Sequence, residues 1–442
     1  FTFAIGYNTV DGVDDLGLTI SGIGSFVGAP AATTDIGALA SSAKSVLAVL
    51  RHTGVFADVS GMRVSAPKSS VWATTQQLRM QLAHASVSGE KVPLRSQDRT
   101  LGAQHGYSRR RVPSRISKEI EACARMCDRI GALPLAMEQR AQLVGMFVLP
   151  KSLYAVAISK PSNKVLARLR AMCSRAIWGQ ANRHRSNAVL YTCFVPGHRC
   201  DPHQTSAYLT VLTVRRVLRR HFSMLPVIQR IIELRNEGYG AGSALTGPGH
   251  ALHHALRRCG ASLNLLRNSF AYRTPTGETK EVLFIGADTQ ACQHDLREAL
   301  RAQQWLTLSQ HRGGFDGVQY GVDRGASTSL FKFLPGLPRY HLRCCMAGAV
   351  ATLDRLKKMG VVDDDACPGC GQCAETWRHI ADHCPAYDGI RYRDFSVAQW
   401  HNLPECLRLR GLVPVQGDDV PRDDVLGIAA NVQYTLLDLF TE

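Results

Sequence analysis

The chain has 442 residues, of which 45% are hydrophobic, a proportion that indicates a globular protein and excludes an intrinsically disordered one. No apolar run approaches the roughly 18 residues of a membrane-spanning helix, so the sequence predicts no membrane partner. The formal net charge is +16, which favours an acidic partner such as nucleic acid.

One segment carries this charge. Residues 101–230 hold 22 Lys and Arg against 5 Asp and Glu, a net of +17, whereas the other 312 residues hold 30 basic and 31 acidic side chains. Such segregation is expected where a phosphate backbone lies. A solubilising surface is the plain alternative. An acidic membrane surface is a third, but no amphipathic anchor pattern supports it.

The first predicted elements are short strands and one helix. Residues 16–20 fit a buried strand, and residues 36–50 have the apolar spacing of a helix. Residues 53–75 are typical of a turn at Gly61 followed by a strand that contains Val71 and Trp72.

Four helices are predicted next, over 113–130, 136–148, 165–177 and 207–221, and the second is expected to stop at Pro150. Each buries one apolar face and presents cations on the other. The basic side chains of this segment that we predict to contact nucleic acid are Arg109, Arg110, Arg111, Lys164, Arg168, Arg215, Arg216, Arg219 and Arg220.

The remaining chain is more varied. Residues 236–338 form a region of uncertain fold that starts with a Gly-rich linker and includes a segment, 274–285, that resembles a hairpin. A basic helix is predicted over 339–358 and adds further candidate nucleic-acid contacts, namely Arg339, Arg343, Lys357 and Lys358. Residues 393–442 are predicted to form an acidic tail.

The cysteines indicate a reduced, intracellular protein. Fourteen in a chain of this length fall well below the density of a disulfide scaffold. Most of them, such as Cys123, Cys127 and Cys173, stand alone in apolar helical contexts and are predicted to be small buried side chains.

Four clustered residues predict a zinc site. Cys367, Cys370, His379 and Cys384 follow the spacing C-x2-C-x8-H-x4-C. Two thiolates from a tight turn, with an imidazole and a thiolate one helical turn apart, complete a tetrahedral structural site that leaves no position open for catalysis. Cys373 and His383 are alternative ligands; we favour Cys370 because Cys-Pro-x-Cys makes the better turn.

The same segment resembles the C-terminal zinc knuckle of non-LTR (LINE-type) retrotransposon reverse transcriptases. That family has Cys-Pro-x-Cys, then Glu-Thr, then His-x4-Cys-Pro, and this chain has Glu375-Thr376 and Cys384-Pro385 at those places. Residues 60–70 resemble the family segment that follows the catalytic hairpin of the palm, with Ser65 in place of the usual Asn. Residues 133–154 and 178–179 resemble its helical thumb.

The resemblance implies a polymerase palm. Its catalytic candidates are Asp14 and Asp15, which precede a strand, and Lys68, which is expected near the incoming triphosphate; Gly12 replaces the usual aromatic residue. Nucleotide addition uses two Mg²⁺ ions held by carboxylates from two strands. The chain starts 13 residues before Asp14, so we expect the partner strand to lie upstream, in a longer protein.

These interpretations predict an α+β protein, mainly α-helical. Its parts are the C-terminal part of a palm (1–100), a basic helical thumb (101–235), a helical linker region (236–338), a basic helix with a CCHC zinc knuckle (339–392) and the acidic tail (393–442). Zn²⁺ is the predicted structural cofactor, and Mg²⁺ is expected only with the complete palm.

Three classes of function remain open. The first is the C-terminal portion of an RNA-directed DNA polymerase that grips template RNA and target or primer DNA during target-primed reverse transcription and is inactive alone. Deoxynucleotides bind only to the complete palm in this case, and the protein works in a nuclear or cytoplasmic ribonucleoprotein. The second is a non-catalytic zinc protein that binds nucleic acid and derives from such an element. The third is a structural zinc protein without a nucleic-acid partner.

Overall fold

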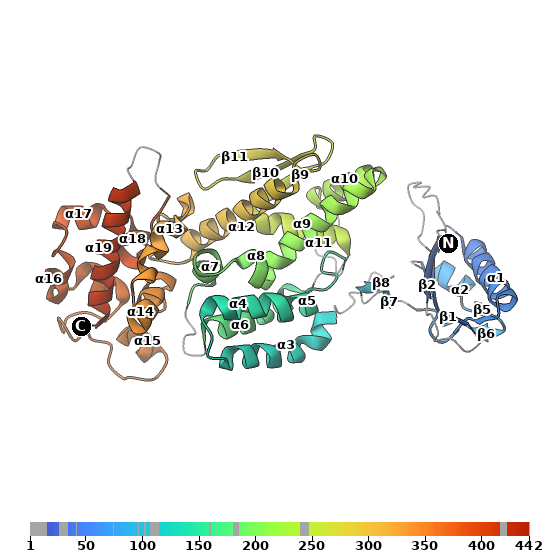
Figure 1. The fold of residues 1–442 in the computed structure, drawn as a ribbon, viewed down its shortest axis with the longest axis horizontal. Coiled ribbons are helices and arrows are strands. Elements are labelled where there is room, and N and C mark those ends of the chain that lie inside the picture. The colour runs from blue at the N-terminus through green and yellow to red at the C-terminus, as the bar shows by residue number, and fades with distance from the viewer. Residues whose placement is uncertain are drawn as a thin grey trace. The chain divides into compact units, whose positions relative to one another are not determined.

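The computed structural model describes residues 16–25, 34–40, 42–73, 75–95, 97–100, 103–106, 115–158, 161–179, 185–238, 247–415 and 422–441. The chain divides into two compact units, of which unit 1 is Phe1–Arg115, Ile158–Lys160 and Gly238–His250, and unit 2 is Ile116–Ala157, Pro161–Glu237 and Ala251–Glu442. Figure 1 shows that helices dominate and strands are few, which confirms the predicted mainly helical α+β class.

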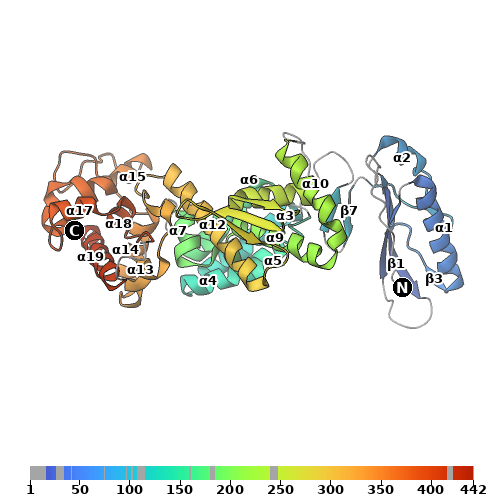
Figure 2. The ribbon, with the colours of Figure 1, turned by 90° about the horizontal axis from the view of Figure 1, so that it is seen from above.

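Unit 1 contains a small antiparallel sheet beside one long helix. Strand β1 (Leu16–Ser25) pairs with β2 (Thr34–Ala40), β3 (Met62–Arg63) and β4 (Ser70–Ala73). Helix α1 (Ala43–Val59) runs along the sheet (Figure 2) and buries Val46, Leu50 and Ala57. The smaller elements are α2 (Gln76–Gln81), β5 (Ser86–Val87), β6 (Glu90–Lys91), β7 (Gln97–Thr100) and β8 (Ala103–Gly106).

The helix predicted over 36–50 is displaced in the structure. Residues up to Ala40 belong to β2, and α1 starts after Ser42, whose side chain caps the helix by accepting the Ser45 N–H. The helix then continues to Val59, and the turn predicted at Gly61 follows it, with Gly61 at a φ of +63°; β4 contains Val71 and Trp72, as predicted. Gly54 lies within it where α1 approaches β5, and a Cβ there would meet Val87 at 3.4 Å. This glycine therefore allows α1 and β5 to pack closely.

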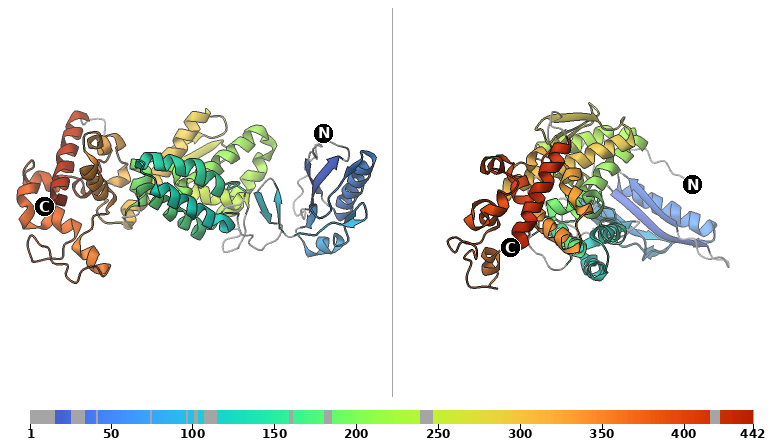
Figure 3. Two further views of the ribbon diagram at one scale, coloured as in Figure 1. Left: turned by 60° about the horizontal axis from the view of Figure 1, so that its bottom comes forward. Right: turned by 60° about the vertical axis from the view of Figure 1, so that its left-hand side comes forward.

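Unit 2 begins with a run of helices. They are α3 (Arg115–Ala132), α4 (Met137–Leu143), α5 (Leu149–Ser152), α6 (Asn163–Trp178), α7 (Asn187–Val189), α8 (Gly197–Cys200), α9 (Pro202–Arg220) and α10 (Leu225–Asn236). The four predicted helices correspond to α3, α4, α6 and α9, whereas α7, α8 and α10 were not predicted. Figure 3 shows the teal helices α3, α4 and α6 side by side. The predicted small buried cysteines Cys123, Cys127 and Cys173 lie in their shared core.

The prediction that Pro150 stops the second helix is wrong. A π-turn over Val144–Val148 follows α4, and the Leu149 N–H donates to the Val144 carbonyl. Pro150 then occupies the first turn of α5, where a missing N–H leaves no helical hydrogen bond unmade. The helical path therefore continues to Ser152.

Residues 236–338 are more than a linker. Among the described ones are α11 (Pro248–Cys259), α12 (Thr289–His311) and α13 (Arg324–Thr328), and a sheet of β9 (Ala261–Asn264), β10 (Ser269–Arg273) and β11 (Thr279–Leu283). The segment predicted as a hairpin, 274–285, holds the turn at 274–278 and β11, and the strand paired with β11 is β10, which lies before that segment. One core joins this region to α9 and α10 through Val211, Leu218 and Ile232. The expected boundary near residue 235 therefore crosses a continuous core.

The single helix predicted over 339–358 is two helices. Helix α14 (Gly336–Ala347) ends at Gly348, whose φ of +63° is left-handed, and α15 (Leu353–Lys358) starts after a short extended segment. Glycine adopts this helix-ending conformation without the Cβ clash of other residues.

The predicted acidic tail is also a packed part of unit 2. Residues 393–442 include α17 (Val397–Asn402), α18 (Glu405–Arg410) and α19 (Arg422–Thr441), preceded by α16 (Asp388–Arg391). Val432, Leu436 and Leu439 of α19 share a core with Trp377 and Ile380 of the cysteine segment. Among the described helices, none has the length and apolar character needed to cross a membrane.

Candidate metal centre

A tight loop supplies the first two cysteines. The Cys367 N–H donates to the Cys373 carbonyl at 2.7 Å, and the Gly371 N–H donates to the Cys367 carbonyl at 2.7 Å. Gly371 has a φ of +66°, a conformation that turns the chain sharply and favours glycine. These bonds hold Cys367 and Cys370 on the inside of one loop.

A π-turn supplies the other two ligands. Residues His379–His383 form it, and the Cys384 N–H donates to the His379 carbonyl at 2.7 Å. The sequence predicted an ordinary helical turn here. A five-residue turn suits the His-x4-Cys spacing better, because its wider hydrogen-bonded ring brings residues five apart onto one side.

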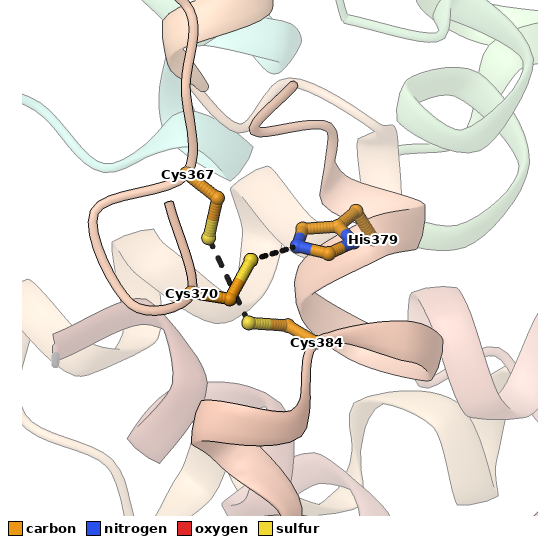
Figure 4. Close-up of side chains that lie close together, drawn as sticks. All are labelled: Cys367, Cys370, His379 and Cys384. Atoms are coloured by element: carbon orange, nitrogen blue, oxygen red, sulfur yellow. Dashed lines mark hydrogen bonds between the residues drawn. The ribbon is translucent and has the colours of Figure 1, made fainter. Parts of the chain in front are cut away.

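The four predicted ligands converge (Figure 4). The Sγ atoms of Cys367 and Cys384 are 3.7 Å apart, and the Sγ of Cys370 lies 3.3 Å from the His379 Nε2. All four ligand atoms lie within 4.8 Å of one another. Around a tetrahedral zinc, two thiolates are about 3.8 Å apart, and a thiolate and an imidazole nitrogen about 3.5 Å. The cluster therefore fits one such ion.

Burial separates these ligands from the alternatives. Cys367, His379 and Cys384 are buried, whereas Cys373 and His383 are exposed and lie outside the cluster. Three thiolates and one imidazole form a closed donor set, which suits a structural metal ion rather than a catalytic one.

The thiols differ in acidity before a metal binds. The backbone N–H of Gln372 lowers the pKa of Cys370 to about 6, whereas burial raises the pKa of Cys384 to about 11. Cys370 is thus largely a thiolate at neutral pH, and Cys384 loses its proton when a metal binds.

Two arginines that the sequence did not single out hold the π-turn. Arg391 is 1% exposed and donates to the carbonyl of Ile380 at 2.7 Å, to that of Cys384, and to Asp388. Arg408 of α18 pairs at 3.0 Å with the buried Asp382 inside the turn. No sequence signal identifies these arginines, because their role depends on carbonyls and a carboxylate that the fold brings to them.

The catalytic candidates Asp14 and Asp15 lie outside the described residues. Lys68 is exposed in the turn between β3 and β4. Ala73, at the end of β4, lies opposite Leu16 at the start of β1, and Ser70, at the start of β4, lies opposite Thr19. Lys68 precedes this pairing, in a turn in which its N–H donates to the Ser65 carbonyl at 3.1 Å.

Within residues 101–230, five predicted nucleic-acid contacts are exposed in the structure: Lys164, Arg168, Arg216, Arg219 and Arg220. Arg168 of α6 pairs with Glu121 at 2.6 Å, and Arg219 of α9 donates to the Thr289 hydroxyl at 3.1 Å. Exposed pairs of this kind are weak, so both guanidiniums remain accessible. Arg109, Arg110 and Arg111 lie outside the described residues.

Arg215 does not have the exposed position expected of it. It is 4% exposed, and its guanidinium donates to the carbonyls of Phe284 (2.6 Å) and Ala287 and to the Thr289 hydroxyl. These bonds tie α9 to the segment before α12. A phosphate has no access to this side chain, whose role is structural.

The candidates near the knuckle are also largely engaged within the protein. Arg339 donates twice to the Leu334 carbonyl, and Arg343 pairs with Glu138 at 3.1 Å. On α15, the carboxylate partners are Asp365 at 2.6 Å for Lys357 and Asp354 at 2.8 Å for Lys358. These neighbouring carboxylates reduce the positive field that the segment was predicted to present.

No protein-family model matches this chain, and no curated protein is similar to it.

Proposed function

We propose that this chain is the C-terminal portion of a non-LTR-type reverse transcriptase, which holds template RNA and target or primer DNA and is inactive alone. The carrying observation is the four-ligand cluster. A segment whose Cys-Pro-x-Cys, Glu-Thr and His-x4-Cys-Pro resembles the family knuckle brings its three sulfurs and one imidazole within 4.8 Å. Zn²⁺ bound there supplies folding energy and no catalysis.

Charge supports the nucleic-acid part of this proposal. Residues 101–230 have a net charge of +17, and the exposed Arg216, Arg219 and Arg220 stand together in the last turns of α9. Such cations attract phosphates over a distance set by the salt concentration. The proposed setting is a nuclear or cytoplasmic ribonucleoprotein.

A second candidate is a non-catalytic zinc protein that binds nucleic acid. The residue before the aspartates favours it, because Gly12 stands where the catalytic hairpin of the family has an aromatic side chain. The two candidates share the knuckle and the basic surface. They differ in whether Asp14 and Asp15, joined by carboxylates from an upstream strand, hold the two Mg²⁺ ions of a polymerase.

Polymerase assays separate the candidates. Incorporation of labelled deoxynucleotide on a primed RNA template is measured for the 442-residue chain and for a version extended upstream through the palm. We expect no incorporation by the former, and incorporation by the latter that Asp14→Ala/Asp15→Ala abolishes. An inactive extended version that still binds the primed template would favour the second candidate.

Filter binding tests the nucleic-acid binding that both candidate functions share. We expect the 442-residue chain to bind single-stranded RNA and DNA with log affinity falling linearly with log salt. Arg216→Glu/Arg219→Glu/Arg220→Glu is expected to weaken binding and flatten that slope. Absence of binding to either nucleic acid would contradict both candidates and leave a purely structural zinc protein.

A further inference from the structure

A second concentration of charge lies within unit 2, away from the metal centre. A cavity of about 520 Å³ is bordered by α6, the start of α7, α9, α11 and α12. Fourteen described residues line it; none of them is Asp or Glu, and five are arginines, namely Arg170, Arg185, Arg257, Arg258 and Arg312. Three of these arginines lie outside the basic segment 101–230.

Helix ends bring several of the arginines to the cavity. Arg257 and Arg258 are in the last turn of α11, and Arg312 caps the C-terminal end of α12. The carbonyls at a helix C-terminus favour nearby cations. This effect explains why arginine is tolerated at each position, but it does not neutralise five guanidiniums.

Asp201 supplies counter-charge to Arg170 at this cavity. Asp201 is fully buried and accepts from Arg170 at 2.6 Å, while its other oxygen caps α9 by accepting the His203 N–H at 2.9 Å. Burial lowers the pKa of Arg185, Arg258 and Arg312. Their guanidiniums are thus partly desolvated close to other cations, and an anion in the cavity would relieve this cost.

The other lining groups indicate which anion fits. Hydroxyl and amide side chains such as Ser186, Asn187, Gln303 and Gln304 suit phosphate and sugar oxygens. A pocket built for a nucleotide base is expected to offer an aromatic side chain on which the base stacks. The described lining contains no Phe, Tyr or Trp. The combination favours the backbone of a strand over a free nucleotide.

We propose that this cavity binds successive phosphates of a single nucleic-acid strand, with Arg257 and Arg258 as its principal contacts. The inference rests on the proposed function and deepens it, because it locates the strand on unit 2. RNA and DNA offer the same phosphate chemistry, and the cavity provides for either.

Filter binding of a labelled single-stranded RNA to the full chain, over a range of salt concentrations, tests this site. Arg257→Glu/Arg258→Glu is expected to weaken binding about tenfold or more. It should lower the salt slope by about 1.4, because each lost phosphate contact on a single strand contributes about 0.7. Arg257→Glu alone, at an exposed position, should lower the slope by about half as much without disturbing the fold.

The matched control is Arg267→Glu/Arg273→Glu. It makes the same charge change at exposed positions in the turn between β9 and β10 and at the end of β10, outside the cavity, and is expected to keep the slope of the unmodified chain. Binding of a single-stranded DNA of the same sequence is measured in the same way, so that the two sources of phosphate are compared. A lower salt slope for Arg257→Glu/Arg258→Glu with either RNA or DNA supports the site.

Two results would overturn the inference. One is a cavity variant with the same affinity and slope as the control, while the unmodified chain binds RNA; the proposed function then stands without this site. The other is displacement of the RNA by pyrophosphate or a nucleoside triphosphate at micromolar concentration, which would assign the cavity to a small phosphate ligand. A chain that binds neither RNA nor DNA contradicts the proposed function itself.

Discussion

At the scale of single residues, the metal centre depends on side chains of two kinds, those that bind the ion and those that hold the backbone around it. The distances among Cys367, Cys370, His379 and Cys384 match a tetrahedral ion. Cys373 is exposed, and its carbonyl rather than its thiol serves the loop.

Serine substitutions test this division. Cys370→Ser is expected to abolish stable binding of one zinc per chain, because serine removes one of four ligands. Cys373→Ser, three residues away, is the control and should retain the full zinc content. Metal analysis of the purified variants gives the answer. Loss of zinc from the Cys373 variant alone would show that the wrong cysteine was assigned.

Substitution of Arg391 tests whether the side chains that hold the backbone around the metal centre stabilise it. Arg391→Met keeps much of the side-chain volume but leaves the carbonyls of Ile380 and Cys384 without their buried donor. Each unpaired buried carbonyl costs about 1–3 kcal/mol, so we expect a loss of about 3 kcal/mol in the free energy of unfolding and faster zinc release to a chelator.

The control for that change is Arg393→Met. Arg393 is 49% exposed and pairs with Asp438 at 2.8 Å on the surface, so its loss should cost less than about 1 kcal/mol. Urea denaturation and the rate of zinc transfer are compared for the two variants. Equal effects would mean that Arg391 contributes no more than an ordinary surface cation.

At the scale of elements, two glycines have opposite roles. Gly348 ends α14 with a φ of +63°, and a Cβ there would lie 3.3 Å from the guanidiniums of Arg312 and Arg410. Gly427 is exposed within α19, and a Cβ there would meet no atom within 4 Å. Substitution of glycine by alanine is therefore expected to change the stability of the protein in opposite directions at the two positions.

Gly348→Ala is expected to destabilise the protein by at least about 1 kcal/mol, because alanine is strained in the left-handed region. Gly427→Ala should stabilise it by about 0.5–1 kcal/mol, the helix-propensity difference. Thermal unfolding followed by circular dichroism measures both, with a lower midpoint expected for the first and a higher one for the second. A stabilising Gly348→Ala would show that α14 and α15 prefer to be one helix.

At the scale of the whole molecule, the C-terminal helix belongs to the same core as the metal segment. Val432, Leu436 and Leu439 pack with Trp377 and Ile380, and the Gln433 amide donates to the carbonyls of Ser327 (3.0 Å) and Gly411 (2.9 Å). Burying each such Val or Leu contributes about 1.5–3 kcal/mol.

Removal of residues 416–442 is therefore expected to expose the core beneath the knuckle. Limited proteolysis should cut the shortened chain faster around residues 350–415 than the full chain, and a dye that binds exposed apolar surface should fluoresce more. Deletion of residues 436–442 alone is expected to give an intermediate rate of proteolysis and an intermediate dye fluorescence. If the shortened chain resisted proteolysis as well as the full chain does, residues 416–442 would be a tail that contributes nothing to the core.

Local patterns of the sequence were enough for part of this picture. The helices α3, α4, α6 and α9 follow from apolar periodicity, and the four metal ligands follow from a spacing that one loop and one turn satisfy. Hydrogen bonding within a few residues and burial of one helix face decide these features, so no distant partner is needed to predict them.

Tertiary packing decided the rest. Arg215 appeared to belong to an exposed cluster, but its acceptors come from residues 284–289, which no local pattern connects to α9. The arginines of the cavity come from helices far apart in the chain. Residues 393–442 were predicted to be a tail from their acidic composition, although α19 has an apolar face that packs in the core. A sequence reports the charge of each side chain, whereas its burial and its partners depend on which distant segments the fold places against it.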